Sequence, residues 1–511
     1  MKRALLLAAL AASLLSAATP KKPKLVVAII IDQFRYDYLT RFRGDFTAGF
    51  DRLLRHGALF TNAKYIHFPT VTAIGHSTFL SGGTPSITGI VGNDWYDRQE
   101  NKAVTSVSDS DTKLVGGGND PGASPHRLLV STLGDELKMS DGGKSRVIGI
   151  SLKDRAAILP AGHMANAAYW FDLKSGNFVS STYYFQELPG WVSDFNAGRS
   201  ADKFMGVKWL NHTLPTERKA YFGNNTESPF EASPYGNEVM EQFVERAIAA
   251  EQLGKRDVTD ILTVSYSSND KVGHDYGTFS PEEREVTIAT DKLLERLFQA
   301  LDRQVGLDNV LVVLTGDHGV SLSAQEAQAN RMPGGRYPGS TVKNVIQGAL
   351  AARYGEGQWV AGSWDLSIFL NRKLIADHHL DPVEVRRAAA EAAYTVDHLA
   401  RVYTWDQLVS GAVPGDEMSR RVMNGFNVRR SADLNFMPEP YWLVTNSTTS
   451  HGTTYSYDAH VPVIFLGPGI VPGHYDDSVT VNDIAPTLAT ILEVETPSGS
   501  IGRVLTEMFA K

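Results

Sequence analysis

Six acidic and imidazole side chains are the residues of this sequence best suited to binding metal ions. They are Asp32, Asp270, His274, Asp317, His318 and one of His451 or His460. Such oxygen and nitrogen ligands suit zinc, with manganese or magnesium as weaker alternatives, and the chain has no cysteine to offer a thiolate. Since six ligands exceed what one tetrahedral ion needs, we expect two ions about 3.5–4 Å apart, a geometry used for phosphoryl transfer.

A turn with two hydroxyl groups, Thr70 and Thr72, precedes a predicted helix at about residues 73–81. A threonine in the first turn of a helix lies among unpaired backbone N–H groups, at the positive end of the helix dipole, where phosphate is stabilised. Threonine is also favoured there as a plain helix cap. Beside two metal ions, one of these hydroxyls would bind an ion and act as a nucleophile.

Four unbroken apolar runs predict strands that are buried on both faces, as in a parallel sheet. They span residues 25–32, 145–155, 260–268 and 309–319. Asp32 closes the first run at its C-terminal end, where ligands bind in open parallel sheets, although it could instead cap the helix that follows. The runs therefore predict an α/β fold with a ligand site at one edge of the sheet.

Two further pairs of residues follow these strands. Asp270 and His274 stand four apart just after the third run, where one helical turn could aim both at one ion. Lys153 and Arg155 stand two apart at the end of the second run, so they project to the same side. Solvated loops are the alternative for both pairs.

Composition limits the possible functions. The chain has 511 residues and a formal net charge of −8, which argues against nucleic-acid binding as its main role. Residues 1–18 have the basic start, short apolar run and small residues of a secretory signal peptide, and no other stretch is long enough to span a membrane. We therefore expect a soluble protein that is periplasmic or secreted.

The expected architecture is a three-layer α/β sandwich with a mostly parallel central sheet flanked by helices. Residues 19–511 would form a single domain, with cap or rim inserts at roughly 157–236 and 320–440. The polar stretch at about 106–124, rich in Ser, Asp and Gly, is expected to form a surface loop.

The chain resembles the alkaline phosphatase superfamily through motifs that cover nearly the whole mature sequence. In order they are FPTVTAIGHSTFLSGGTP, GIVGNDWYD, SLKDRAAI, NDKVGHDYG, TGDHG and SHGTTYSYDAHVP. More narrowly, it resembles the exported, threonine-nucleophile alkaline phosphatases of the nucleotide pyrophosphatase/phosphodiesterase branch.

The resemblance implies a role for each candidate residue. Thr72, preferred to Thr70 for its spacing before the Gly-His pair, would be the nucleophile and a ligand of one zinc. The other ligands of that zinc would be Asp32, Asp317 and His318, and those of the second zinc Asp270, His274 and His451. His451 is preferred to His460 because the family's ligand lies in a His-Gly pair. Asn93 would donate to a phosphoryl oxygen.

Lys153 and Arg155 narrow the expected substrate class. A phosphate monoester carries one more anionic oxygen than a diester, and two cations can stabilise that charge. In the family, an asparagine with a lysine and an arginine at these places marks the monoesterases. We therefore expect a broad-specificity phosphomonoesterase that acts on small phosphorylated substrates through a phosphothreonine, with a monomer favoured.

Three other functions remain as alternatives. A phosphodiesterase or nucleotide pyrophosphatase could use the same two metal ions. A sulfatase is disfavoured because it needs a cysteine or serine that becomes formylglycine. An exported metal- or phosphate-binding module without turnover is the non-enzymatic alternative.

Overall fold

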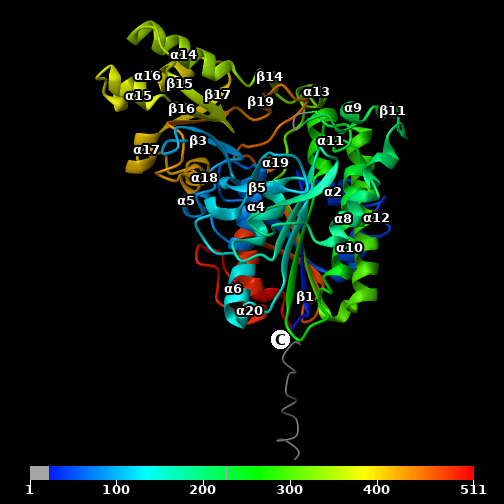
Figure 1. The fold of residues 1–511 in the computed structure, drawn as a ribbon. Helices are drawn as coiled ribbons and strands as arrows, with labels where there is room; N and C mark the ends of the chain where they lie inside the picture. The colour runs from blue at the N-terminus through cyan, green and yellow to red at the C-terminus, as the bar shows by residue number, and fades with distance from the viewer. Residues whose placement is uncertain (1–21, 225–226, 511) are drawn as a thin grey trace, which may run out of the picture.

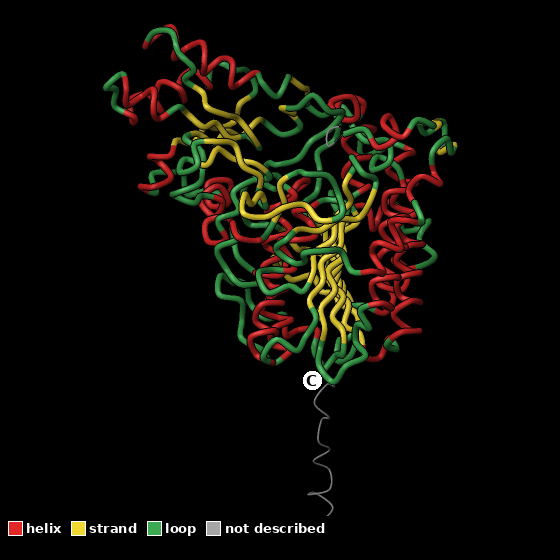
Figure 2. The backbone as a smooth tube through the Cα atoms, viewed as in Figure 1, coloured by secondary structure: helices red, strands yellow, loops and turns green. Residues whose placement is uncertain are grey.

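The computed structural model describes residues 22–224 and 227–510, and the expected signal peptide at residues 1–18 lies outside them. At its centre is an 11-stranded sheet in the order β21-β2-β20-β13-β1-β12-β7-β8-β9-β5-β6 (Figure 2). The neighbouring strands from β13 to β8 run parallel to one another. The main strands are β1 (Leu25–Ile31), β2 (Ala58–Lys64), β7 (Val147–Ser151), β8 (Ala167–Asp172), β9 (Asn177–Ser181), β12 (Asp260–Tyr266), β13 (Val310–Gly316), β20 (His460–Leu466) and β21 (Gly473–Thr480).

The apolar sequence of β1 reflects burial on both of its faces. All seven residues of the strand are buried, and alternate side chains enter two different hydrophobic cores. The two sets are Leu25, Val27, Ile29 and Ile31 on one face, and Val26, Ala28 and Ile30 on the other. Because neither face meets water, the strand has no polar alternation.

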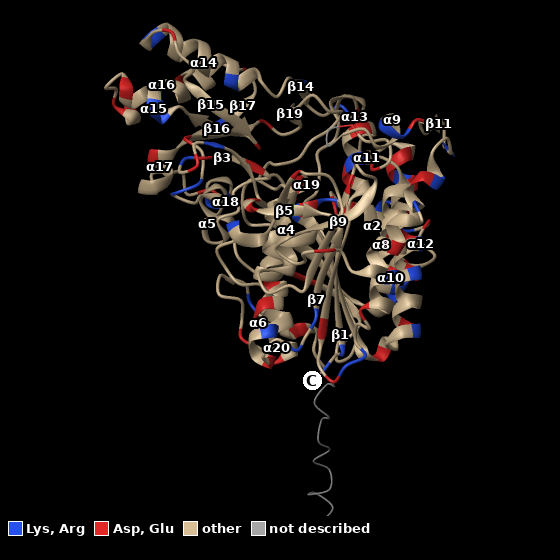
Figure 3. Ribbon diagram, viewed as in Figure 1, with Lys and Arg blue, Asp and Glu red and all other residues tan. Residues whose placement is uncertain are grey.

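Helices cover both faces of the sheet, which confirms the expected three-layer α/β fold (Figure 1). One layer contains α3 (Gly49–His56), α8 (Gly190–Ala197), α10 (Pro234–Ala250) and α12 (Pro281–Gln304). The other contains α4 (Thr72–Ser81), α6 (Leu133–Asp141), α7 (Asp154–Ala161) and α20 (Ile484–Leu492). In Figure 3 the charged residues gather on the outer helices and the cap, while the strands between the layers are largely uncharged.

The stretch expected as a surface loop at 106–124 forms strands instead, so that expectation was wrong. β5 (Ser108–Val115) pairs with β9, and β6 (Pro121–Ala123) completes the edge of the central sheet. Most β5 residues are exposed or only partly buried. An edge strand that faces water carries polar residues, which makes it resemble a loop in sequence.

The two expected inserts differ in structure. Residues 157–236 contain β8 and β9, which extend the central sheet, and the small elements β10 (Lys208–Trp209), β11 (His212–Thr213) and α9 (Arg218–Phe222). Residues 320–440, here called the cap, contain a separate four-stranded sheet with its own hydrophobic core. Its elements include α14 (Thr341–Tyr354), β15 (Val360–Trp364), β16 (Ser367–Leu370), α15 (Arg372–Asp377), α16 (Pro382–Ala393), β17 (Leu399–Thr404), α17 (Trp405–Ser410), α18 (Glu417–Gly425) and β18 (Leu434–Pro438).

The cap lies at the upper left of Figure 1, above the layers that enclose the central sheet. Across residues 22–224 and 227–510, we find no helix with the length and apolar character needed to cross a membrane.

Candidate active site at the carboxyl edge of the sheet

Parallel strands bring the predicted site residues together at one edge of the sheet. In the register of β1 with its neighbours, Ile31 pairs with Tyr266 of β12 and with Gly316 of β13. Asp32 therefore leaves β1 next to Asp317, which directly follows β13. These strand ends meet at the carboxyl edge, where open α/β sheets bind ligands.

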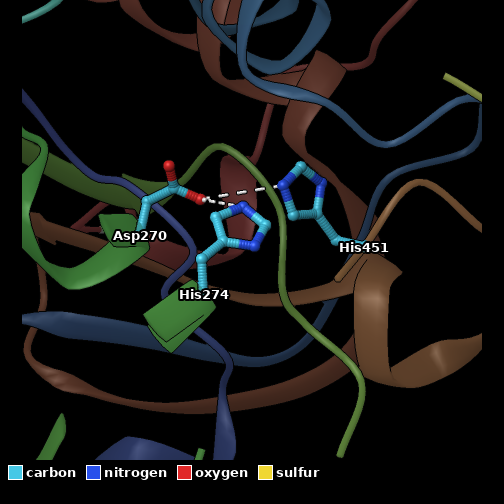
Figure 4. A group of neighbouring side chains, drawn as sticks. All are labelled: Asp270, His274 and His451. Atoms are coloured by element: carbon cyan, nitrogen blue, oxygen red, sulfur yellow. Dashed lines mark ion pairs between the residues drawn. The ribbon is translucent and has the colours of Figure 1, made fainter. Parts of the chain in front are cut away.

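Asp270, His274 and His451 form the first group of potential metal ligands (Figure 4). Asp270 and His274 are one turn apart on α11 (Ser268–Tyr276), and His274 Nε2 lies 3.1 Å from Asp270 Oδ1. His451 Nε2 lies 3.7 Å from the same oxygen. One ligand atom from each residue lies within 4.8 Å of the other two, so the three could hold one ion.

His460, the alternative to His451, lies elsewhere. Its Nε2 is 2.9 Å from the backbone oxygen of Thr61, and its ring stacks on Tyr36 with the centroids 4.5 Å apart. The structure thus brings His451, and not His460, to the carboxylates.

Asp32, Asp270 and His318 form a second group whose ligand atoms lie within 4.8 Å of one another. His318 Nε2 is 3.6 Å from Asp32 Oδ1 and 3.5 Å from Asp317 Oδ2. The rings of His318 and His451 stack with their centroids 3.6 Å apart, which joins the two groups.

Backbone carbonyls set the tautomer of all three histidines. The Nδ1 atoms of His274, His318 and His451 each lie 2.9 Å from a carbonyl oxygen, those of Thr449, Gly319 and Thr70 respectively. A carbonyl only accepts hydrogen bonds, so each Nδ1 carries the proton. In a neutral ring, Nε2 then presents its lone pair to the carboxylates, which is the form that binds a metal ion.

Buried atoms without partners face one another where Asp317 adjoins the second group. Asp32 Oδ1, Asp317 Oδ2 and His318 Nε2 are buried and have no hydrogen-bond partner among the described residues. Buried polar atoms are normally paired, and lone pairs that face one another repel. A cation between them would remove both penalties, and the mixed oxygen and nitrogen donors fit zinc.

The pKa values of the histidines favour neutral rings at two of the three positions. Burial lowers the pKa of His318 to about 4. Burial, together with the charges of His318 and His274, holds the pKa of His451 well below its ordinary value. At His274 burial acts in the same direction, but the Asp270 carboxylate outweighs it and the pKa is raised.

Lys153 neutralises the outer oxygens of two carboxylates. Its Nζ lies 2.5 Å from Asp32 Oδ2 and 2.6 Å from Asp270 Oδ2. Although burial opposes the charge, the two carboxylates raise the pKa of Lys153 above its ordinary value. Burial and Asp317 raise the pKa of Asp32 to about 7, although Lys153 acts in the opposite direction. At Asp270, Lys153 and His274 outweigh burial, so the pKa of Asp270 is lowered.

Thr72 begins helix α4, every residue of which is buried. The helix packs directly on the backbone of the Asp317 segment because residue 75 is glycine, and a Cβ there would overlap the Asp317 carbonyl oxygen. The hydroxyl of Thr70 donates to the carbonyl of Thr453 at 2.8 Å. Of the two candidate nucleophiles, Thr70 is thus engaged in a structural contact, and Thr72 lies on the helix that adjoins Asp317.

Asn93 and Arg155 offer donors beside this helix. Asn93 Oδ1 accepts a hydrogen bond from the backbone N–H of Ala73 at 2.9 Å, which leaves its amide NH₂ as a donor. The Arg155 side chain is only 26% exposed, and its Nε has no hydrogen-bond partner among the described residues. Asn93, Lys153 and Arg155 all line a cavity of about 920 Å³.

Two neighbours of the site were not predicted from the sequence. The backbone N–H of Gln33 donates to Asp317 Oδ1 at 2.9 Å, and its side-chain amide donates to Asp270 Oδ1 at 2.8 Å, so Gln33 bridges these two carboxylates. His76 has Nδ1 2.8 Å from the Thr72 carbonyl and 3.4 Å from Asp317 Oδ2. The sequence offered one signal for each residue: Gln33 directly follows Asp32, and His76 lies four residues after Thr72.

Comparison with known proteins agrees with this architecture. A family model described as type I phosphodiesterase / nucleotide pyrophosphatase matches residues 26–460. Alkaline phosphatase PafA of Elizabethkingia meningoseptica is 35% identical over 96% of this chain and 95% of its own length. Alkaline phosphatase PhoV of Synechococcus elongatus is 36% identical over 96% and 94%.

A crystal structure of wild-type PafA superposes with a TM-score of 0.89 at 34% identity, covering 96% of this chain and 99% of that one. The likeness therefore extends over the sheet, both helical layers and the cap. The chain belongs to the type I phosphodiesterase / nucleotide pyrophosphatase family and is an enzyme of the alkaline phosphatase type within it.

Proposed function

We propose that this phosphatase is an exported, zinc-dependent enzyme that hydrolyses phosphate monoesters through a phosphothreonine at Thr72 and releases inorganic phosphate. The observation that carries the proposal is the set of buried, unpartnered oxygen and nitrogen atoms beside the helix that Thr72 begins. Buried polar atoms without partners carry a free-energy penalty, which a bound cation would remove.

Two zinc ions would be held by this set of residues. Asp32, Thr72, Asp317 and His318 would bind one, and Asp270, His274 and His451 the other. When bound, such a pair of ions lowers the pKa of a coordinated hydroxyl and stabilises charge on the entering and leaving oxygens.

The protein's own groups divide the remaining work. Thr72 Oγ1 loses its proton to solvent and bonds to phosphorus in line as the bond to the alcohol oxygen breaks, and the alcohol leaves with a proton from water. Water then attacks the phosphothreonine, which releases inorganic phosphate and restores the Thr72 hydroxyl. The amide NH₂ of Asn93 and the guanidinium of Arg155 donate to phosphoryl oxygens. Lys153 adds positive charge next to Asp32 and Asp270. The dianionic phosphate of a monoester therefore meets a more positive site than these two carboxylates would form without Lys153.

Two features support the choice of residues and of substrates. One solved structure of PafA is a mutant in which a threonine, an asparagine, a lysine and an arginine are substituted. That threonine and asparagine are as far apart in sequence as Thr72 and Asn93 are here. The lysine and arginine are likewise as far apart as Lys153 and Arg155. The 920 Å³ cavity beside Asn93, Lys153 and Arg155 is far larger than a phosphate group, which favours small phosphorylated substrates of varied shape. A monomer with a cleaved leader at residues 1–18 completes the proposal.

The decisive experiment compares p-nitrophenyl phosphate with bis-p-nitrophenyl phosphate in zinc-loaded enzyme. We expect a higher kcat/KM for the monoester. In Arg155→Ala, monoester hydrolysis should lose about 100-fold, as oxyanion-binding donors do, with a smaller loss for the diester because it carries less charge. A higher kcat/KM for the diester would favour the phosphodiesterase alternative.

A further inference from the structure

The turn between β15 and β16 of the cap has an unfavourable backbone. Trp364 pairs with Ser367, so Asp365 and Leu366 are the two central residues of the hairpin. Both have positive φ, +47° and +62°. Such two-residue turns normally use Asn-Gly or Asp-Gly. A leucine with positive φ is strained, and such strain persists only where the surrounding structure requires it.

The turn carries the Asp365 carboxylate to the loop that holds Asn93. Asp365 Oδ2 accepts a hydrogen bond from the backbone N–H of Asn93 at 3.0 Å. The fit depends on the glycine at position 92, because a Cβ there would lie 2.8 Å from the same oxygen. The next residue of the turn, Leu366, lies close to Gly452, which follows His451.

Asn93 is thereby held from two sides. Asp365 fixes its backbone, and the N–H of Ala73, next to Thr72 on α4, fixes its side-chain oxygen. These two bonds set the direction of the remaining amide NH₂. We infer that Asp365 is a positioning residue, contributed by the cap, that aims Asn93 at the phosphoryl oxygen; this inference rests on the role proposed for Asn93.

The charge around Asp365 is consistent with this role. Burial raises the pKa of its carboxyl to about 6, against the effects of the Asn93 N–H bond and of Arg155, while Asp94 acts in the same direction as burial. The carboxylate is therefore ionised at neutral and alkaline pH. A hydrogen bond to an ionised acceptor is about twice as strong as a neutral one, which suits a fixed support.

The experiment uses the full-length, zinc-loaded enzyme with Asp365→Ala, Asp365→Asn and Asn93→Ala, singly and as the Asp365→Ala/Asn93→Ala double variant. Removal of one oxyanion donor lowers kcat by about 100-fold, which we expect for Asn93→Ala. Asp365→Ala removes the hydrogen bond to the Asn93 N–H and should lower kcat/KM about tenfold, as expected for the loss of one hydrogen bond of about 1.4 kcal/mol. Asp365→Asn, which keeps an acceptor oxygen, should recover part of that loss.

The double variant and phosphate inhibition separate positioning from mere stability. If Asp365 acts through Asn93, the double variant should be no slower than Asn93→Ala alone, and Asp365→Ala should raise the inhibition constant of inorganic phosphate. Asp433→Asn is the control for general damage to the cap, because Asp433 is also buried, accepts the N–H of Leu370 in the same hairpin at 3.0 Å and pairs with three arginines.

Each outcome has one meaning. Wild-type kcat/KM in Asp365→Ala, multiplicative losses in the double variant, or an equal loss in an Asp433→Asn variant that melts like the wild type would overturn the inference about Asp365. Wild-type activity in Asn93→Ala would instead overturn the proposed role of Asn93 itself. Melting curves of every variant show whether a loss reflects unfolding.

Discussion

Replacing Lys153 with methionine tests how the site balances its charge. The ammonium group lies 2.5 and 2.6 Å from oxygens of Asp32 and Asp270, and all three side chains are at most 6% exposed. Methionine keeps the unbranched stem but leaves the two carboxylates without this partner. Removing one member of a buried ion pair destabilises a protein by about 3–5 kcal/mol.

Metal binding should change how strongly Lys153→Met destabilises the protein. In chelator-treated protein we expect the full loss of stability in Lys153→Met. Only protonation of Asp32, whose pKa is raised to about 7, would reduce that loss. In zinc-loaded protein the ions neutralise the same carboxylates, so Lys153→Met should destabilise less. Urea unfolding at pH 8, with and without chelator, measures both values.

Arg155→Met is the matched control. The nearest carboxylate of Arg155 is Asp154, at 3.8 Å, and the arginine side chain is 26% exposed, so a loss below about 1 kcal/mol is expected. The reasoning is refuted if chelated Lys153→Met is as stable as chelated Arg155→Met, or if zinc leaves the difference between them unchanged.

Three further predictions concern other residues. Thr72→Ser should keep phosphatase activity and form a phosphoserine detectable by mass spectrometry, whereas Thr72→Ala should lose at least about 1,000-fold in kcat; unchanged activity in Thr72→Ala would exclude it as nucleophile. His451→Ala should bind about one zinc less per chain by elemental analysis, whereas His460→Ala should bind the wild-type amount, since His460 contacts Thr61 instead; the opposite result would reverse the assignment. Burial raises the pKa of Glu241 to about 8 from 4.5, so folding retains a proton that the unfolded chain has released, and stability should fall as pH rises from about 4.5 to 8. In Glu241→Gln that contribution should vanish, and a stability difference from wild type that does not grow with pH would contradict it.

The sequence predicted the central sheet and most of the strand-end residues because one physical pattern encodes both. An unbroken apolar run indicates a strand buried on both faces, and parallel strands end at the same edge, so the apolar runs placed Asp32 and Asp317 at one edge of the sheet. That the two strands are neighbours is shown by the structure. The edge strand β5 escaped prediction because exposure to water gives it the composition of a loop.

Contacts between distant segments were beyond this kind of reasoning. Asp365 and Asn93 are 272 positions apart, and Gln33 and Asp270 are 237 apart. Neither Gln33 nor Asp365 lies in a pattern of period 2 or 3.6 that would identify it. Their positions depend on how the cap and the loops pack, which a single sequence does not reveal.

The hydrogen bonds that orient the three imidazoles have a consequence for how this site can change. The partners of His274, His318 and His451 are carbonyl groups of the main chain, and no substitution removes a main-chain carbonyl. Side chains around these three histidines can therefore diverge, or be altered in the laboratory, while Nδ1 of each ring keeps its hydrogen-bond partner. New substrate preferences can be selected at the cavity wall without losing the orientation of the imidazoles.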